Sequence, residues 1–345
     1  MKLKLYFKAA VDIVSLFFVT LFRLLFNALV VGPVKGRYVH GCAGANSIVS
    51  TLQQDLILDN ALIAFKQILM PLAMFSTAFY DLPLQGTDTV QVPYYPLETA
   101  TSRDYNGSYV MGDGTSTQAK PIVINKRKYQ PLSFTSAELR RQPRFDPELL
   151  GMLKGRKLAE DVLVDILSVV TNANFGAAVF TGAAASLIVD DIIDLGATAQ
   201  ALKWPQGGRG MILGPTYVAG IQKDMVAGRG FATFGKDPAG AIVNFPNLAG
   251  FSIADSNVIP TNGENLIGMM VYRSAVLVGF APIEPAPEVM LELARYEVIS
   301  DADTQLSLEY REWGNAQSDT ANRIIECNYG YAAGELAALR RMTSA

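Results

Sequence analysis

The sequence has one histidine, His40, and two cysteines, Cys42 and Cys327, among its 345 residues. One histidine excludes metal sites that need two imidazole ligands, and it leaves a single imidazole as a possible catalytic base. His40 lies in a glycine-rich stretch that predicts a loop, and we do not expect it to be catalytic. Two cysteines cannot form a disulfide framework and are typical of a protein in a reducing cytoplasm.

Charged residues are also scarce. They make up 18% of the chain, whereas 50% of its residues are hydrophobic and the mean hydropathy is +0.21. Because so little charge would leave apolar surface in water on a monomer, the composition favours an assembly. The 29 basic and 32 acidic residues give a net charge of −3, without the basic excess expected of a protein that wraps nucleic acid through phosphate contacts.

Residues 1–32 form the most apolar segment. Its uncharged run, Ile13–Phe22, is bounded by Asp12 and Arg23 and is short for a membrane span. An amphipathic helix fits better, and we expect it to dock onto the protein's own assembly or an interior partner. A secretory signal and a lipoprotein-like site before Cys42 remain alternatives, although the cleavage region is poor and His40 stands where a small residue is required.

A change of period near residue 87 predicts a two-stranded flap. Val90 and Val92 alternate with polar residues, a turn-rich stretch follows, and a returning strand is expected from Pro121 to Tyr129. An isolated hairpin is marginal in water, so the flap should rest on another surface. Before the flap, residues 47–79 show helical spacing that Pro71 interrupts.

The clearest helix should begin at Pro147. Asp146 is a good N-cap, Glu148 complements the helix dipole, and Phe145 and Leu150 occupy the positions of a hydrophobic staple. The apolar stripe continues to about Asn172. Residues 177–300 then predict an α/β lobe, followed by strands. The expected later elements are helices at 190–202, from 216 and at 334–342, and strands at 211–213, 251–254, 269–272, 289–298, 305–310 and 323–328.

Acidic pairs and glycine-rich loops are the remaining candidates for chemistry. The pairs are Asp190 with Asp191, Asp301 with Asp303, and Glu309 with Glu312, and adjacent acids usually serve caps and surfaces. The glycine-rich stretches at 207–210 and 228–230 have neither Walker nor dinucleotide-binding spacing, so they predict loops. We therefore expect no catalytic residue, cofactor site or metal site.

The distribution of charge is more informative. Residues 120–157 contain ten basic and three acidic residues, and residues 284–312 contain eight acidic and two basic residues. Opposed potentials can steer subunits together and fix their register. We therefore predict that the two patches meet between neighbouring subunits, through the basic residues Lys120, Lys126, Arg127 and Lys128 and the acidic residues Glu292, Glu297, Asp301 and Asp303.

Four segments resemble the major capsid proteins of tailed bacteriophages, which have the Hong Kong 97-type fold shared with bacterial encapsulins. They are 86–93 at the entry to the flap, 158–161 in the long helix, 250–260 in the lobe and 328–331 after the last strand. The likeness covers about residues 50–345. Some members crosslink a flap lysine to an asparagine of a neighbour, but no matching partner residues are evident here. The hydrophobic residues 1–32 depart from the usual arm.

The resemblance implies an α+β subunit with an N-terminal arm, an extended β-hairpin loop, a long spine helix, and peripheral and axial domains. The expected segments are 1–46, a hydrophobic extension; 47–86, the arm; 87–133, the extended loop; 134–185, the peripheral domain with the spine helix; 186–288, the axial domain; and 289–345, the return strands of the peripheral domain.

The function implied is that of a coat protein whose hexamers and pentamers form an icosahedral shell around double-stranded DNA, contacted without sequence specificity. Scaffold, portal and decoration proteins would be further partners, and no membrane partner is expected. The subunits would assemble in the host cytoplasm, and the finished protein would reside in the virion. The alternatives are an encapsulin-like compartment and a membrane-associated or secreted enzyme led by residues 1–32.

Overall fold

The computed structural model describes residues 47–74, 89–94, 105–107, 109, 118–135, 137–138, 146–183, 186–224, 247–301, 304 and 306–345. His40, Cys42, Phe145 and Asp303 lie outside these ranges, as do residues 1–32 and the stretch 228–230. The chain divides into two units, 1–38 and 39–345, and every described residue belongs to the second. None of the described helices combines the length and apolar character needed to cross a membrane.

An antiparallel sheet of five strands is built around the long strand β12. Its order is β10 (Arg295–Ser300), β11 (Ser307–Asn315), β12 (Thr320–Ala333) and β3 (Lys126–Thr135). Strand β3 pairs with the first part of β12, and β9 (Val276–Phe280) pairs with its end.

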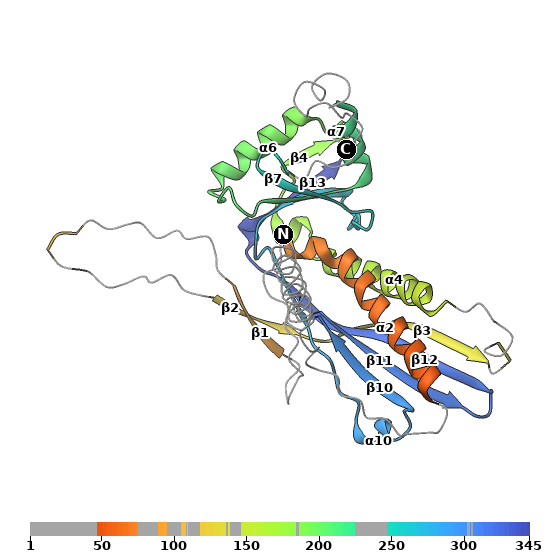
Figure 1. The fold of residues 1–345 in the computed structure, drawn as a ribbon. Helices are drawn as coiled ribbons and strands as arrows, with labels where there is room; N and C mark the ends of the chain where they lie inside the picture. Colours follow the sequence, from red (N-terminus) through yellow and green to blue (C-terminus); the bar gives the residue numbers. More distant parts are fainter. Residues whose placement is uncertain are drawn as a thin grey trace, which may run out of the picture. The chain divides into compact units, whose positions relative to one another are not determined.

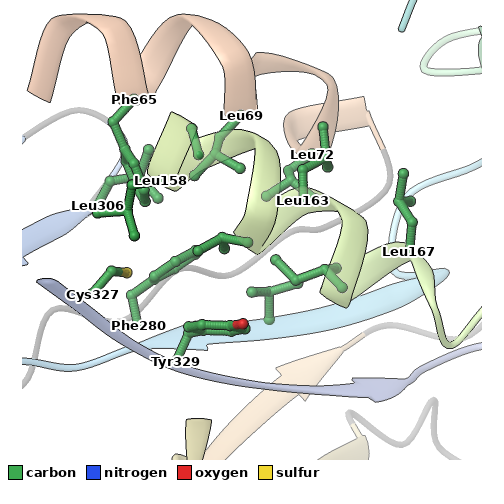
Figure 2. Close-up of a cluster of buried hydrophobic side chains, with 14 of the residues drawn as sticks. Phe65, Leu69, Leu72, Leu158, Leu163, Leu167, Phe280, Leu306, Cys327 and Tyr329 are labelled. Atoms are coloured by element: carbon green, nitrogen blue, oxygen red, sulfur yellow. The ribbon is translucent and has the colours of Figure 1, made fainter. Parts of the chain in front are cut away.

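Two helices cover one face of this sheet. Helix α2 (Ser47–Leu69) packs along α4 (Pro147–Leu167), and both contact the sheet (Figure 1). Figure 2 shows Phe65 and leucines of these helices, with Leu72 from the turn of 3-10 helix after α2, packed with side chains of the strands and of the loop before β11. The labelled residues are Phe65, Leu69, Leu72, Leu158, Leu163, Leu167, Phe280, Leu306, Cys327 and Tyr329.

A second, mixed sheet has six strands. Its order is β4 (Phe180–Gly182), β13 (Leu339–Ser344), β8 (Leu266–Val271), β5 (Gly210–Leu213), β7 (Phe251–Asp255) and β6 (Asn247–Leu248). Strand β5 is parallel to β7 and β13 is parallel to β4, whereas the other pairs are antiparallel. Side chains from α6 (Val189–Ala201) and α7 (Pro215–Asp224) form a second core with its strands.

The flap begins as a two-stranded ribbon. Strand β1 (Thr89–Tyr94) pairs antiparallel with β2 (Gln118–Val123), as expected. Val92, Ile122 and Ile124 are buried with Leu277 and Ala281, so the base of the ribbon rests on the region of β9. Four short helices complete the described part: η1 (Met70–Met74), α5 (Asn172–Phe175), α10 (Pro287–Met290) and η3 (Leu336–Ala338).

The start of the long helix is confirmed. The Asp146 carboxylate accepts backbone hydrogen bonds from Glu148 and Leu149 at 3.1 and 3.2 Å, and Pro147 is the first helical residue. The helix ends at Leu167, earlier than the apolar stripe suggested, and a turn separates it from α5. Val170 is nevertheless buried, because it continues the core beyond the helix.

Several predicted elements were wrong in kind or extent. The strand expected at 289–298 begins as helix α10 and a turn, and strand β10 starts only at Arg295. The expected single strand from Pro121 to Tyr129 is two strands, because β3 leaves the ribbon and pairs with β12 over ten positions. The expected helix at 334–342 is the short η3 followed by β13, because Leu339 and Met342 are buried where β13 pairs with β8 and β4. The last strand of residues 289–345 therefore belongs to the six-stranded sheet, not to the return strands of the five-stranded one.

Candidate assembly surface

The two faces of the five-stranded sheet have different roles. Directly paired residues of an antiparallel sheet lie on the same face, and successive residues alternate between faces. The covered face, which carries Tyr310, Cys327 and Tyr329, packs against α2 and α4. The opposite face, called the open face below, carries Glu309 and Glu326 and the exposed ring of Tyr129.

Lys126 lies on the covered face and is engaged within its own chain. Its ammonium group is 3.0 Å from the Asp165 carboxylate, 2.6 Å from the Tyr331 hydroxyl and 4.3 Å from the centre of the Tyr331 ring. Tyr329 also donates a hydrogen bond to Asp165 at 2.8 Å. Burial opposes ionisation of both charged groups, but these hydrogen bonds raise the pKa of Lys126 and lower the pKa of Asp165.

The other three residues of the predicted basic patch lie in three different environments. Arg127 lies on the open face, where its Nε is 3.2 Å from the Glu326 carboxylate and donates to the Asn328 side chain at 3.1 Å. Lys120 donates to the backbone carbonyl oxygen of Ala333. Lys128 is half-buried on the covered face, where its charge helps to lower the pKa of Asp165.

The acidic residues do not form the single exposed patch that the sequence suggested. Glu297 is 1% exposed and forms an ion pair with Arg295, so its burial removes it from any exposed patch. Asp301 is 2.9 Å from Lys66 of α2 and accepts hydrogen bonds from Thr304. Glu292 is exposed.

Two glutamates of the open face form a buried charge cluster that sequence reasoning missed. Glu309 and Glu326 are paired across β11 and β12, and each is 1% exposed. Arg311 forms an ion pair with both carboxylates, at 3.1 Å to Glu309, and Asn328 donates to Glu309. Burial, together with the neighbouring charge of Glu309, raises the pKa of Glu326.

The signal for this cluster was the period-two alternation of apolar and charged residues in 308–311. Glu309 and Glu312, three residues apart in a strand, lie on opposite faces, so they are not the pair that their spacing suggested. Glu312 instead pairs with Arg323 at 3.1 Å. The carboxylates of this sheet thus anchor strands to one another, and the described residues contain no group of three or more acidic, histidine or cysteine side chains that could hold a metal ion.

A groove of about 370 Å³ lies over β3, β12 and the end of β11. Its apolar lining includes Tyr129, Pro131, Trp313 and Ile324, and Arg127 lies at its margin. Tyr129 is 58% exposed, and Trp313 and Ile324 are half-buried. The groove therefore offers apolar side chains and a cation on the face that the helices leave open.

The arrangement of a five-stranded sheet under two helices, a mixed six-stranded sheet and a two-stranded ribbon is the Hong Kong 97-type capsid fold, of the α+β class. A chain from the capsid of the cyanophage P-SCSP1u superposes with a TM-score of 0.54 at 13% sequence identity, over 79% of this chain and 86% of that one.

Two further structures are similar at lower scores. The mature capsid of bacteriophage PhiM1 gives a TM-score of 0.49 at 9% identity, over 77% of this chain and 85% of that one. The virus-like particle from Pyrococcus furiosus gives 0.46 at 13% identity, over 85% and 98%. No family model and no curated protein matches the sequence.

Proposed function

We propose that this protein is the shell-forming major capsid protein of a tailed bacteriophage, with a structural role and no catalytic one. Copies would form hexamers and pentamers that close into an icosahedral shell around double-stranded DNA. The observation that carries the proposal is the fold, which over 79% of the chain resembles a chain of the P-SCSP1u capsid.

Exposed apolar side chains on α4 support a role in assembly. Leu149, Met152 and Leu153 are 54%, 44% and 57% exposed near the start of the helix, although its opposite side is fully buried. A surface of this kind is normally covered by a partner, and in a shell the most abundant partner is another copy. The low proportion of charged residues, 18%, agrees with this.

Electrostatic contact between subunits remains part of the proposal, but with fewer residues than the sequence suggested. Arg127, Lys120 and Lys128 on one side and Glu292 and Asp301 on the other are the described members with some exposure. Lys126 and Glu297 serve the subunit itself, and Asp303 lies outside the described residues. The proposed packaged DNA would be contacted without sequence specificity, and scaffold, portal and decoration proteins would be additional partners.

Expression of the full-length chain, followed by sedimentation and electron microscopy, tests this function. We expect closed particles, with a co-expressed scaffold if the chain alone does not form them, assembled in the cytoplasm of the host. Nuclease-protected double-stranded DNA in particles from infected cells supports a virion shell, whereas particles filled with protein cargo support the encapsulin-like alternative. A monodisperse monomer at high concentration, under all conditions and with scaffold, overturns the proposal.

A further inference from the structure

A small apolar knob precedes strand β10 of the five-stranded sheet. It consists of α10 (Pro287–Met290) with Leu291, whose side chain is 88% exposed, and Val289 is 45% exposed. Glu288 and Glu292 flank these side chains and are exposed. Residues 284–294 contain three glutamates and no lysine or arginine, so the knob is apolar with an acidic margin.

The groove on the open face has the complementary character. Tyr129, Pro131, Trp313 and Ile324 line it, and Arg127 lies at its margin with 45% of its side chain exposed. The bonds of Arg127 to Glu326 and Asn328 use Nε, and a guanidinium group carries four further N–H donors. A carboxylate approaching this margin can therefore be bound without displacing the bonds that fix the arginine.

Knob and groove lie toward opposite edges of the sheet. The knob immediately precedes β10, at one end of the order β10-β11-β12-β3, and the groove lies over β12 and β3, at the other end. Three strand spacings, roughly 14 Å, separate β10 from β3 within one chain. If a second copy lies beside β3 with its own β10 as the nearest strand, the knob of that copy lies next to the groove of the first.

Such a contact joins the knob of one copy to the groove of the next, and the same contact is repeated along the series of copies. Heterologous contacts of this type generate rings when the rotation between copies closes. The contact would also shield the edge of β3, which among the described strands pairs only with β12.

We propose that Leu291 and Val289 of one copy occupy the groove of the next, with Glu288 and Glu292 beside the neighbour's Arg127. The occupant is a second copy because its apolar and acidic pattern matches the groove and because the two surfaces lie toward opposite edges of one sheet. This inference rests on the proposed function for its partner and adds the surfaces through which adjacent subunits bind.

Replacement of Leu291 by aspartate tests the knob. We expect Leu291→Asp to raise the concentration needed for particle assembly at least tenfold, as measured by sedimentation and electron microscopy. The melting temperature and circular dichroism should be unchanged, because the side chain is exposed. Leu336→Asp, at a residue 51% exposed beside the other sheet, is the matched control and should assemble like the wild type.

A cysteine pair tests the contact directly and does not depend on assembly yield. Tyr129→Cys with Leu291→Cys should give a ladder of disulfide-linked oligomers on oxidation of assembled particles, because disulfides form only between closely placed residues. Each single variant, and Tyr129→Cys with Leu336→Cys, should give none. Normal assembly of Leu291→Asp without a ladder from the cysteine pair overturns this inference and leaves the proposed function intact. Wild-type protein that never forms particles overturns both.

Discussion

Among the charges of the open face, Arg311 connects two adjacent strands. Arg311 lies between the carboxylates of Glu309 and Glu326, whose strands are neighbours. Two carboxylates so close would repel each other, and the guanidinium group and the amide of Asn328 offset that repulsion. A buried pair is weak evidence of net stabilisation, but the loss of one partner leaves a charge that water cannot reach.

Replacement of Arg311 by methionine should therefore destabilise the subunit by about 3 kcal/mol or more at pH 7. Urea unfolding of unassembled subunits measures this loss. Arg156→Met, which removes an exposed pair with Glu160 on α4, is the control and should cost less than about 0.5 kcal/mol. Addition of Glu326→Gln to Arg311→Met should restore part of the stability, because it removes the repulsion between the carboxylates of Glu309 and Glu326. Equal losses for the two arginine variants would contradict the role of this cluster.

Asp165 should make stability depend on acid pH. It binds Lys126 and Tyr329, and although burial opposes its ionisation, these bonds lower its pKa below the ordinary 3.8. Its contribution is therefore fully present above that ordinary value and is lost as the pH falls through the lower pKa of the folded state. Asp165→Asn should cost about 2 kcal/mol at pH 7, the value of a hydrogen bond to a charged group.

The difference between wild type and Asp165→Asn should shrink as the pH falls below 3.8, when measured by urea unfolding at a series of pH values. Asp161→Asn, which removes an exposed pair with Lys157 on the same helix, is the control and should have a small effect throughout. A loss for Asp165→Asn that stays constant down to about pH 2.5, well below the ordinary carboxyl range, would show that packing, not charge, is responsible.

At the scale of elements, two glycines set the distance between α2 and α4. Gly151 and Gly155 are buried, and a methyl group on either would overlap the backbone of α2, at the carbonyl oxygens of Ile57 and Ala61 respectively. The helices thus touch backbone to backbone at this crossing. Because Gly151 and Gly155 are four residues apart, both lie on the same side of α4.

Gly155→Ala should destabilise the protein by about 2 kcal/mol, because overpacking costs more than the roughly 1 kcal/mol that alanine gains in helix propensity. Thermal unfolding measures the change. Gly196→Ala in α6 is the matched control, since a methyl group there would be 3.4 Å from the carbonyl oxygen of Ala249, and we expect a gain in stability of up to about 1 kcal/mol. A stabilised Gly155→Ala protein would show that α2 can move away from α4 without loss.

At the scale of the whole molecule, the proposed subunit contacts should respond to salt. Raising the salt concentration from about 0.1 M to about 1 M shortens the screening length from about 10 Å to about 3 Å. Light scattering should then show slower assembly of particles at salt concentrations where circular dichroism still shows folded subunits. The reversal of Lys126, Arg127 and Lys128 together is a poor probe, because Lys126 and Arg127 hold ion pairs within the subunit.

Lys128→Glu breaks neither of these ion pairs, but it places a carboxylate near Asp165, so the melting temperature is measured beside the assembly rate. Lys203→Glu, on a residue just after α6, is its control. We expect the first to slow assembly severalfold at low salt and the second to leave it unchanged. If neither changes the rate, and salt has no effect either, then charge does not steer the assembly of this protein.

Residues 1–32 remain the subject of a prediction from sequence alone. Their apolar run and flanking charges predict a helix that docks onto the lattice or an interior partner. Fractionation of expressing cells tests this, with a chain that starts at Ser47 for comparison. Full-length protein should leave the membrane fraction after salt and carbonate washes. Full-length protein retained there, beside a soluble shorter chain, would support a membrane anchor instead.

The sequence by itself determined the elements whose signals are local. Asp146 and Pro147 set the start of α4, and the alternation at 89–92 predicted β1, because capping and side-chain periodicity depend on near neighbours. The order of these elements was also sufficient for the resemblance to the capsid fold. The low proportion of charged residues indicated an assembly, because composition does not depend on how the chain folds.

The tertiary structure decided what depends on partners distant in sequence. Only the pairing of β3 with β12 separated it from β2, and only burial between β8 and β4 made residues 339–344 a strand. Lys126 and Glu297 read as surface charges in the sequence, but Asp165 and Arg295 bind them within the subunit. The sequence around a charged residue does not show which face of the sheet its side chain will lie on. Strand pairing fixes that face, and the paired segments are as far apart in sequence as Arg127 and Asn328.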